Sequence, residues 1–143
     1  MEKYKFIKAR DKSDLVRFYP VMKELRSELT YADYLGLYAQ AHTADGYEIT
    51  GLEIGQDIVA LMGYRVLVDF VRGRHLYIDD LVSSSKERSK GYGAALLKHA
   101  EDLAKELDCK VLRLSAGIEN EKGQKFYERE GWSLRAVVYT KKL

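Results

Sequence analysis

Cysteine and proline are nearly absent from this sequence of 143 residues, which contains one of each. The single cysteine, Cys109, permits no internal disulfide and no metal site built from several cysteines. No apolar run is long enough to span a bilayer, and the charged stretch MEKYKFIKAR lacks the apolar core of a signal peptide. We therefore expect a cytoplasmic protein with no membrane partner and no metal site.

An excess of charge of either sign is also missing. The chain has 24 Lys and Arg against 22 Asp and Glu, a formal net charge of +2. This charge is too small to predict a nucleic-acid partner. An apolar content of 46% with 32% charged residues is typical of a soluble globular protein. The length fits one domain with a full core, and we expect a single domain over residues 1–143.

The most informative stretch covers residues 77–107. An apolar strand leads into a loop of serines and charged residues, the loop ends in Gly91-Tyr92-Gly93, and an amphipathic helix follows. Glycine allows unusual backbone dihedrals and a close approach to a ligand. The first turn of a helix offers N–H groups without internal partners and a partial positive charge. With Arg88 and Lys90 beside it, this loop is predicted to cradle a pyrophosphate.

Two common nucleotide-binding loops do not fit this stretch. The phosphate loop of NTPases requires Lys-Ser or Lys-Thr after its last glycine, and neither follows Gly93. The dinucleotide fingerprint requires a third small residue where Leu96 stands. A glycine turn that only starts a helix remains the alternative interpretation.

The pattern R-x-x-G-x-G, formed by Arg88, Gly91 and Gly93, resembles the acetyl-CoA loop of the GNAT N-acetyltransferase superfamily. The segment from Asn120 to Tyr127 is similar to the later N-x-x-[AG]-x-x-F-Y segment of that family, at a suitable spacing. Together the two elements cover roughly the C-terminal half of the chain. The sequence departs from the family strand pattern L-x-V-x-P, because serine occupies positions 83 and 85.

The resemblance implies an α/β fold with a mixed, mostly antiparallel sheet flanked by helices. In this GNAT-like acyl-CoA N-acyltransferase fold, two neighbouring parallel strands splay apart, here residues 77–82 and 110–116. It also implies that acetyl-CoA binds at the end of the first of these strands, the glycine loop and the later segment. The expected cofactor-binding residues are Leu81, Val82, Ser83, Arg88, Ser89, Lys90, Gly91, Tyr92, Gly93, Ala94, Asn120, Gly123 and Tyr127.

Tyr127 matches the general acid of the family. A phenol with a pKa near 10 can protonate a departing thiolate. The alternative is a core aromatic residue beside Phe126. Asn120 matches a residue that contacts the pantetheine arm, although capping the next helix would also explain it.

Asp79 and Asp80 are the candidates for handling the amine. Adjacent strand residues point to opposite faces, so we expect only one of them to line a cleft. Diamine and related small-amine acetylases of the superfamily carry an acidic pair just before this stretch. Asp79 is therefore the expected base or amine-binding group, directly or through water, and Asp80 is the alternate. The other interpretation is one exposed carboxylate and one paired with an arginine.

Three tyrosines at helical spacing, Tyr31, Tyr34 and Tyr38, share one face of a helix predicted over residues 30–44. They form either a half-buried packing face or a wall of the acceptor pocket. In the second case Tyr31, Tyr34 and Asp79 contact the acceptor.

Hydrophobic spacing predicts the remaining elements. Strands are expected over residues 3–9, 47–54, 58–70, 75–82, 110–116 and 132–143, with Gly63 marking a bulge or a close neighbour. A first helix starts near Ser13, where Pro20 should kink or divide it. Further helices follow the glycine loop and Asn120, the last ending at Gly131.

The predicted function is transfer of an acetyl group from acetyl-CoA to a primary amine of a small molecule. Direct attack is favoured because no Ser-His-Asp or Cys-His set is evident. The alternatives are a non-catalytic acyl-CoA sensor and acetylation of a protein N-terminus or lysine. The resemblance also allows a homodimer.

Overall fold

The protein is described by a computed structural model that covers residues 3–88 and 90–143. The chain forms two compact units, one ending at Arg113 and the other spanning Leu114–Leu143. The single domain expected over residues 1–143 stays a prediction. The elements in chain order are β1 Lys5–Lys8, α1 Lys12–Leu25, α2 Tyr31–Asp45, β2 Glu48–Ile54, β3 Asp57–Asp69, β4 Gly73–Ser83, α3 Tyr92–Glu106, β5 Val111–Leu114 and α4 Glu121–Arg129.

The strands form one mixed sheet in the order β1-β2-β3-β4-β5. The first four strands pair antiparallel with their neighbours in sequence. Strand β5 lies beside β4, and helix α3 connects the two strands. Two parallel strands require a crossover of this kind. The predicted mixed α/β fold class is confirmed.

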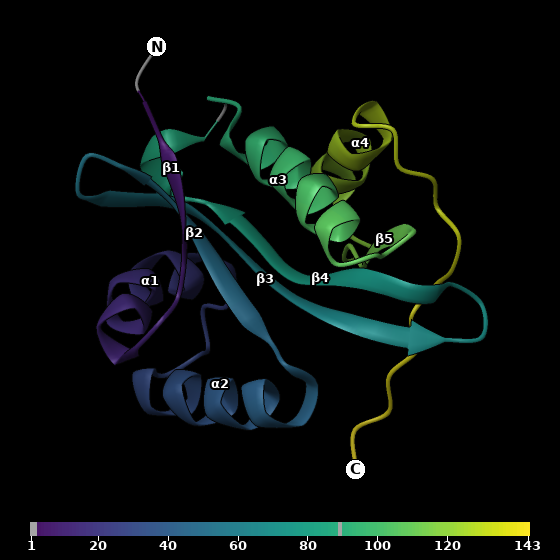
Figure 1. Ribbon diagram of the computed structural model, residues 1–143, viewed down its shortest axis with the longest axis horizontal. Coiled ribbons are helices and arrows are strands. Elements are labelled where there is room, and N and C mark those ends of the chain that lie inside the picture. The colour runs from purple at the N-terminus through teal and green to yellow at the C-terminus, as the bar shows by residue number, and fades with distance from the viewer. Residues whose placement is uncertain (1–2, 89) are drawn as a thin grey trace. The chain divides into compact units, whose positions relative to one another are not determined.

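Helices cover both faces of this sheet in the first unit, with α1 and α2 on one face and α3 on the other (Figure 1). Side chains from α1 and α2 bury a core against the sheet that includes Phe18, Met22, Ile49, Leu61 and Val82. Strand alternation directs the intervening strand residues to the α3 face. The buried residues there include Ala60, Met62, Leu76 and Ile78 from the strands, with Leu96, Leu97 and Ala100 from α3.

Of the two effects predicted for Pro20, a division of the helix does not occur, because α1 runs through that residue, and a kink there stays a prediction. Proline removes the hydrogen bond to the carbonyl four residues earlier, and both Pro20 and Val16 are exposed, where water can replace that bond. The strand predicted over residues 132–143 is absent from this described segment, which has no regular secondary structure. Its alternation of apolar residues is not matched by ladder pairing, and Leu134 and Val138 are largely exposed.

None of the helices in the described part of the chain combines the length and apolar character needed to cross a membrane.

Candidate active site

The predicted cofactor loop connects β4 to α3 in the first unit. Leu81, Val82 and Ser83 end β4, paired with Met62, Leu61 and Ala60 of β3. A short 3-10 turn follows at Ser85–Glu87. Tyr92, Gly93 and Ala94 form the first turn of α3, as the motif predicts.

Gly91 immediately precedes α3 in a left-handed conformation, with φ 83° and ψ 10°. This region is costly for residues with a Cβ and is readily adopted by glycine. A Cβ built on Gly91 would have no neighbour within 4 Å. The glycine is therefore required for the backbone conformation, and space remains beside it. Among the described residues, no side chain caps α3, and its first turn contains no acidic residue.

Hydrogen bonds hold this loop against β3 and α1. The Ser84 amide donates to the Val59 carbonyl at 2.8 Å. The Ser85 amide donates to Oε1 of Glu24 on α1, also at 2.8 Å. Burial raises the pKa of the Glu24 carboxyl, but hydrogen bonds from Ser85 and Ser84 and the charge of Arg88 outweigh it and leave that pKa lowered.

The predicted basic residues of the loop differ in their surroundings. Nζ of Lys90 contacts Oε2 of Glu87 at 2.7 Å. Arg88 is exposed beside the glycine turn. Ser89, also predicted to bind the cofactor, lies outside the described residues.

A β-bulge interrupts the pairing of β3 and β4 near the two candidate carboxylates. Gly63 pairs with Asp80 and Tyr64 with Ile78, so Asp79 is an extra residue in β4. A bulge places two residues of one strand opposite one residue of its partner and breaks the alternation of side chains. The bulge predicted at Gly63 is therefore confirmed.

The expectation that Asp79 and Asp80 face opposite sides of the sheet is wrong. Asp80 bonds to Arg26 at the end of α1, and Asp79 bonds to Arg65, which also bonds to Asp45 of α2. Both carboxylates thus lie on the α1–α2 face, because the extra residue shifts the alternation. The interpretation with one exposed carboxylate is also excluded, since each is paired with an arginine.

Asp79 forms a bidentate contact with one guanidinium group. Nε and Nη2 of Arg65 donate to its two oxygens at 2.9 and 2.8 Å. Burial raises the pKa of the Asp79 carboxyl, although Arg65 partly opposes the shift. Both oxygens are therefore already occupied by a strong donor.

Asp80 is held from two sides by separate elements. Its Oδ1 accepts from Nε and Nη2 of Arg26 at 3.1 and 2.8 Å. Its Oδ2 accepts from the hydroxyl of Tyr47 at 2.6 Å. Burial, followed by the negative charge of Asp80, raises the pKa of Tyr47 well above its ordinary value, so this phenol remains a neutral donor. Neither Arg26 nor Tyr47 could be assigned to this site from the sequence, because they lie 54 and 33 positions from Asp80.

A pocket of about 310 Å³ lies against Asp80 in the first unit. Most of its lining is apolar or aromatic and comes from α1, α2 and the sheet. The lining residues are Met22, Arg26, Leu29, Tyr34, Leu37, Tyr38, Ala41, Tyr47, Ile49 and Asp80.

The residues predicted to contact the acceptor differ in whether they line this pocket. Tyr34 lines it, with its hydroxyl bonded to the Leu15 carbonyl at 2.7 Å. Tyr31 is 41% exposed and is not among the lining residues; its ring meets that of Tyr19 edge-on. Asp79 is likewise not part of the lining.

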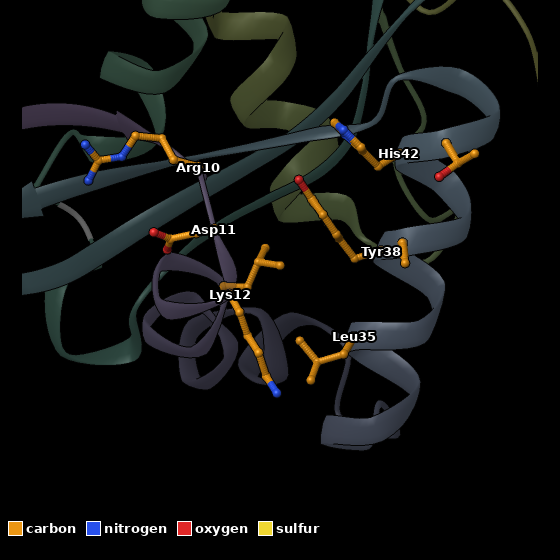
Figure 2. A pocket seen from close by; sticks show the side chains of 9 residues that line it. Arg10, Asp11, Lys12, Leu35, Tyr38 and His42 are labelled. Atoms are coloured by element: carbon orange, nitrogen blue, oxygen red, sulfur yellow. The ribbon is translucent and has the colours of Figure 1, made fainter.

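A second hollow, of about 390 Å³, lies between residues 10–15 and α2. Figure 2 shows Leu35, Tyr38 and His42 of α2 facing the segment that starts α1. Of the three tyrosines predicted to form a packing face or an acceptor wall, Tyr38 lines both this hollow and the pocket beside Asp80, and none of the predicted cofactor-binding residues lines the hollow.

The second unit contains the remaining predicted residues. Asn120 caps α4 by accepting from the Gly123 amide at 3.0 Å. A Cβ on Gly123 would come within 3.0 Å of the Asn120 side chain, so this cap favours glycine there. Tyr127 is partly buried on α4, and its ring contacts those of Phe126 and Trp132. Burial raises the pKa of its hydroxyl.

A family model and a related protein both match this chain to acetyltransferases. The family model described as the acetyltransferase (GNAT) family matches residues 13–132. An uncharacterized N-acetyltransferase of Bacillus subtilis, YhdJ, is 33% identical over 131 residues, covering 91% of this chain and 92% of that protein.

Solved structures show the same fold at low identity. A transcriptional regulator from Bacillus halodurans superposes with a TM-score of 0.86 at 18% identity, over 99% of this chain and 100% of that one. The enzyme AAC(6')-Iy, in complex with the bisubstrate analogue CoA-S-monomethyl-acetylneamine, superposes with a TM-score of 0.83 at 15% identity, over 99% of each chain.

Proposed function

The chain belongs to the GNAT acetyltransferase family, and from this premise we propose that it transfers an acetyl group from acetyl-CoA to a primary amine of a small molecule. The observation that carries the proposal is the position of Asp80. This carboxylate lines a pocket and directly precedes the stretch Leu81–Ser83, which is proposed to hold the thioester.

The proposed cofactor site combines backbone groups with positive charge. The pyrophosphate would bind at Gly91 and the first turn of α3, where amide groups and the helix dipole favour an anion. Arg88 and Lys90 would add charge at the rim. The complex of AAC(6')-Iy with a CoA-containing analogue supports an acyl-CoA ligand for this fold. Asn120 and Gly123 are proposed to meet the pantetheine arm.

Of the two candidate carboxylates, Asp80 is the better group to receive the amine. It lines the pocket, whereas both oxygens of Asp79 are taken by Arg65. A carboxylate offers about four acceptor positions, so Asp80 can accept from the amine while keeping Tyr47 and Arg26. Asp79 then acts as a positioning group for Arg65 on the same face.

The proposed reaction is direct attack. The neutral amine nitrogen forms a bond to the thioester carbonyl carbon, and the carbon–sulfur bond then breaks. The proton lost by the amine passes to Asp80 or through water to solvent. The departing thiolate takes a proton from the hydroxyl of Tyr127, giving the amide and free CoA. Exchange with water then returns a proton to the Tyr127 phenolate and removes the one that Asp80 accepted.

Thiol release from acetyl-CoA in the presence of an amine panel, with mass spectrometry of the products, tests this function. Acetylated amine and stoichiometric CoA are the expected products. Binding of acetyl-CoA without release for any amine or peptide would favour the sensor alternative, and transfer to peptides alone would favour the protein acetyltransferase. Action in the cytoplasm, where acetyl-CoA is available, is part of the proposal.

A further inference from the structure

The pocket beside Asp80 carries almost no net charge. In the part of the chain that the structure describes, its lining has two charged side chains, Arg26 and Asp80, which form an ion pair at 2.8 Å. An acceptor with several ammonium groups would find no second carboxylate in this lining. Desolvating those extra charges beside Arg26 would be unfavourable.

Two of the three tyrosine hydroxyls in this lining are already engaged, and the third belongs to Tyr38. The hydroxyl of Tyr34 already donates to the Leu15 carbonyl, and that of Tyr47 donates to Asp80. Met22, Leu29, Leu37 and Ile49 supply aliphatic surface. A polyhydroxylated acceptor would lose hydrogen bonds to water here with few replacements.

We propose that the acceptor is a monoamine whose single amino group is carried on a compact aliphatic or aromatic body. The apolar body occupies the pocket among Met22, Leu29 and Ile49, and the amine lies at Asp80. A volume of about 310 Å³ suits a short alkyl chain or one ring. This inference rests on the proposed function and names its substrate class.

Three amines with the same six-carbon chain test the proposal: hexylamine, hexanediamine and aminohexanol. They differ at the far end, which carries a methyl group, a second ammonium group or a hydroxyl group. We expect kcat/KM for hexylamine to exceed that for each of the other two by about tenfold or more. Equal or better turnover of hexanediamine or aminohexanol would overturn the proposal.

The same assay separates this inference from the function on which it rests. Amino sugars, aminoglycosides and peptides are added to the panel. Thiol release with any of these, but not with hexylamine, would overturn the monoamine class and leave acetyl transfer standing. If no amine or peptide in the panel gave thiol release, both the monoamine class and the proposed acetyl transfer would be overturned.

Two leucine substitutions on α2 test the pocket itself. Ala41 lines the pocket, whereas Ala44 is exposed and lines neither hollow. Ala41→Leu should raise KM for hexylamine by about tenfold and spare ethylamine, because the larger side chain fills space needed by the long body. Ala44→Leu makes the same change outside the pocket and should leave both values unchanged. Equal effects of the two substitutions would overturn the placement of the acceptor.

Discussion

The hydroxyl of Tyr47 and the carboxylate of Asp80 meet at 2.6 Å in space that Gly63 leaves open. A Cβ built on Gly63 would lie within 3.0 Å of the Tyr47 hydroxyl oxygen and of Oδ2 of Asp80. The glycine at the bulge therefore allows the contact that orients Asp80 toward the pocket.

Gly63→Ala should displace this pair. We expect kcat/KM to fall by about a hundredfold, because a small misplacement of a group that positions the substrate is costly. Acetyl-CoA affinity, measured by calorimetry, should hardly change. Crowding should also lower the free energy of unfolding by about 1–3 kcal/mol. Gly36→Ala is the control, because a Cβ there meets nothing within 4 Å. A Gly63→Ala enzyme with normal turnover would show that the orientation of Asp80 is unimportant.

Asp80→Asn and Asp79→Asn should differ in their effects. Asp80 lines the pocket, so its loss should lower kcat/KM by about a hundredfold while acetyl-CoA affinity is kept. Asp79 contacts Arg65 outside the pocket lining, and its variant should lose less. Steady-state rates with the same amine compare the two variants directly. The reverse order would return Asp79 to the role of amine-binding group.

Substitutions at Gly91 separate backbone conformation from ligand contact. Asparagine tolerates the left-handed region better than other residues with a side chain, and no protein atom would meet its Cβ. Gly91→Asn should therefore fold normally but bind acetyl-CoA about tenfold more weakly, since the side chain intrudes on amide contacts to phosphate. Gly91→Val should lose affinity and stability together.

Gly46→Asn provides the matched control for this experiment. Gly46 ends α2 at φ 70°, also with nothing within 4 Å of a built Cβ. Calorimetry should show unchanged acetyl-CoA affinity in this variant. If Gly91→Asn behaved in the same way, the pyrophosphate would have to bind elsewhere.

Much of the first unit could be predicted from local patterns. Thr30 caps α2, the hairpin turns at residues 55–56, and Gly91 takes the conformation that its motif requires. These features depend on a few neighbouring residues. The helix following Asn120 was predicted for the same reason, because its capping contact spans three positions.

The features that escaped prediction depend on distant partners. A bulge at Gly63 could be anticipated, but its extra residue lies on the other strand, and this placed Asp79 beside Asp80 on one face. Tyr47 and Arg26 reach Asp80 only after the sheet and α1 are assembled. The alternating segment over residues 132–143 predicted a strand, yet alternation alone supplies no neighbouring strand for hydrogen bonding.

Glu24 anchors the predicted cofactor loop by accepting from the Ser85 amide, and Glu24→Gln should reveal how this contact depends on pH. The pKa of the folded carboxyl lies below its ordinary value of 4.5. The stabilisation is therefore fully present above about pH 4.5 and is lost as the pH falls through the lowered pKa. Because the carboxylate is largely exposed, the effect should stay below about 1 kcal/mol.

Urea unfolding at neutral and acid pH measures this effect. The variant should be less stable than the parent at neutral pH and equal to it in acid. Glu28→Gln, an exposed position in the α1–α2 connection, is the control. A stability difference that persisted in acid would mean that Glu24 acts by packing, and not as a carboxylate acceptor.

Tyr127→Phe tests the proposed general acid, because it removes one hydroxyl and keeps the ring that contacts Phe126 and Trp132. Burial raises the pKa of this phenol, so it stays protonated at neutral pH and the activity should not decline through loss of this proton below about pH 10. Removing a general acid typically costs about 10²–10⁴-fold in rate. We expect that loss in kcat with unchanged acetyl-CoA affinity, since the proton moves only as the thiolate leaves. Single-turnover measurements avoid masking by slow product release.

Tyr139→Phe, at an exposed position of the same unit, should leave the chemical step unchanged. A chemical step of parental speed in Tyr127→Phe would assign protonation of the thiolate to another group or to water.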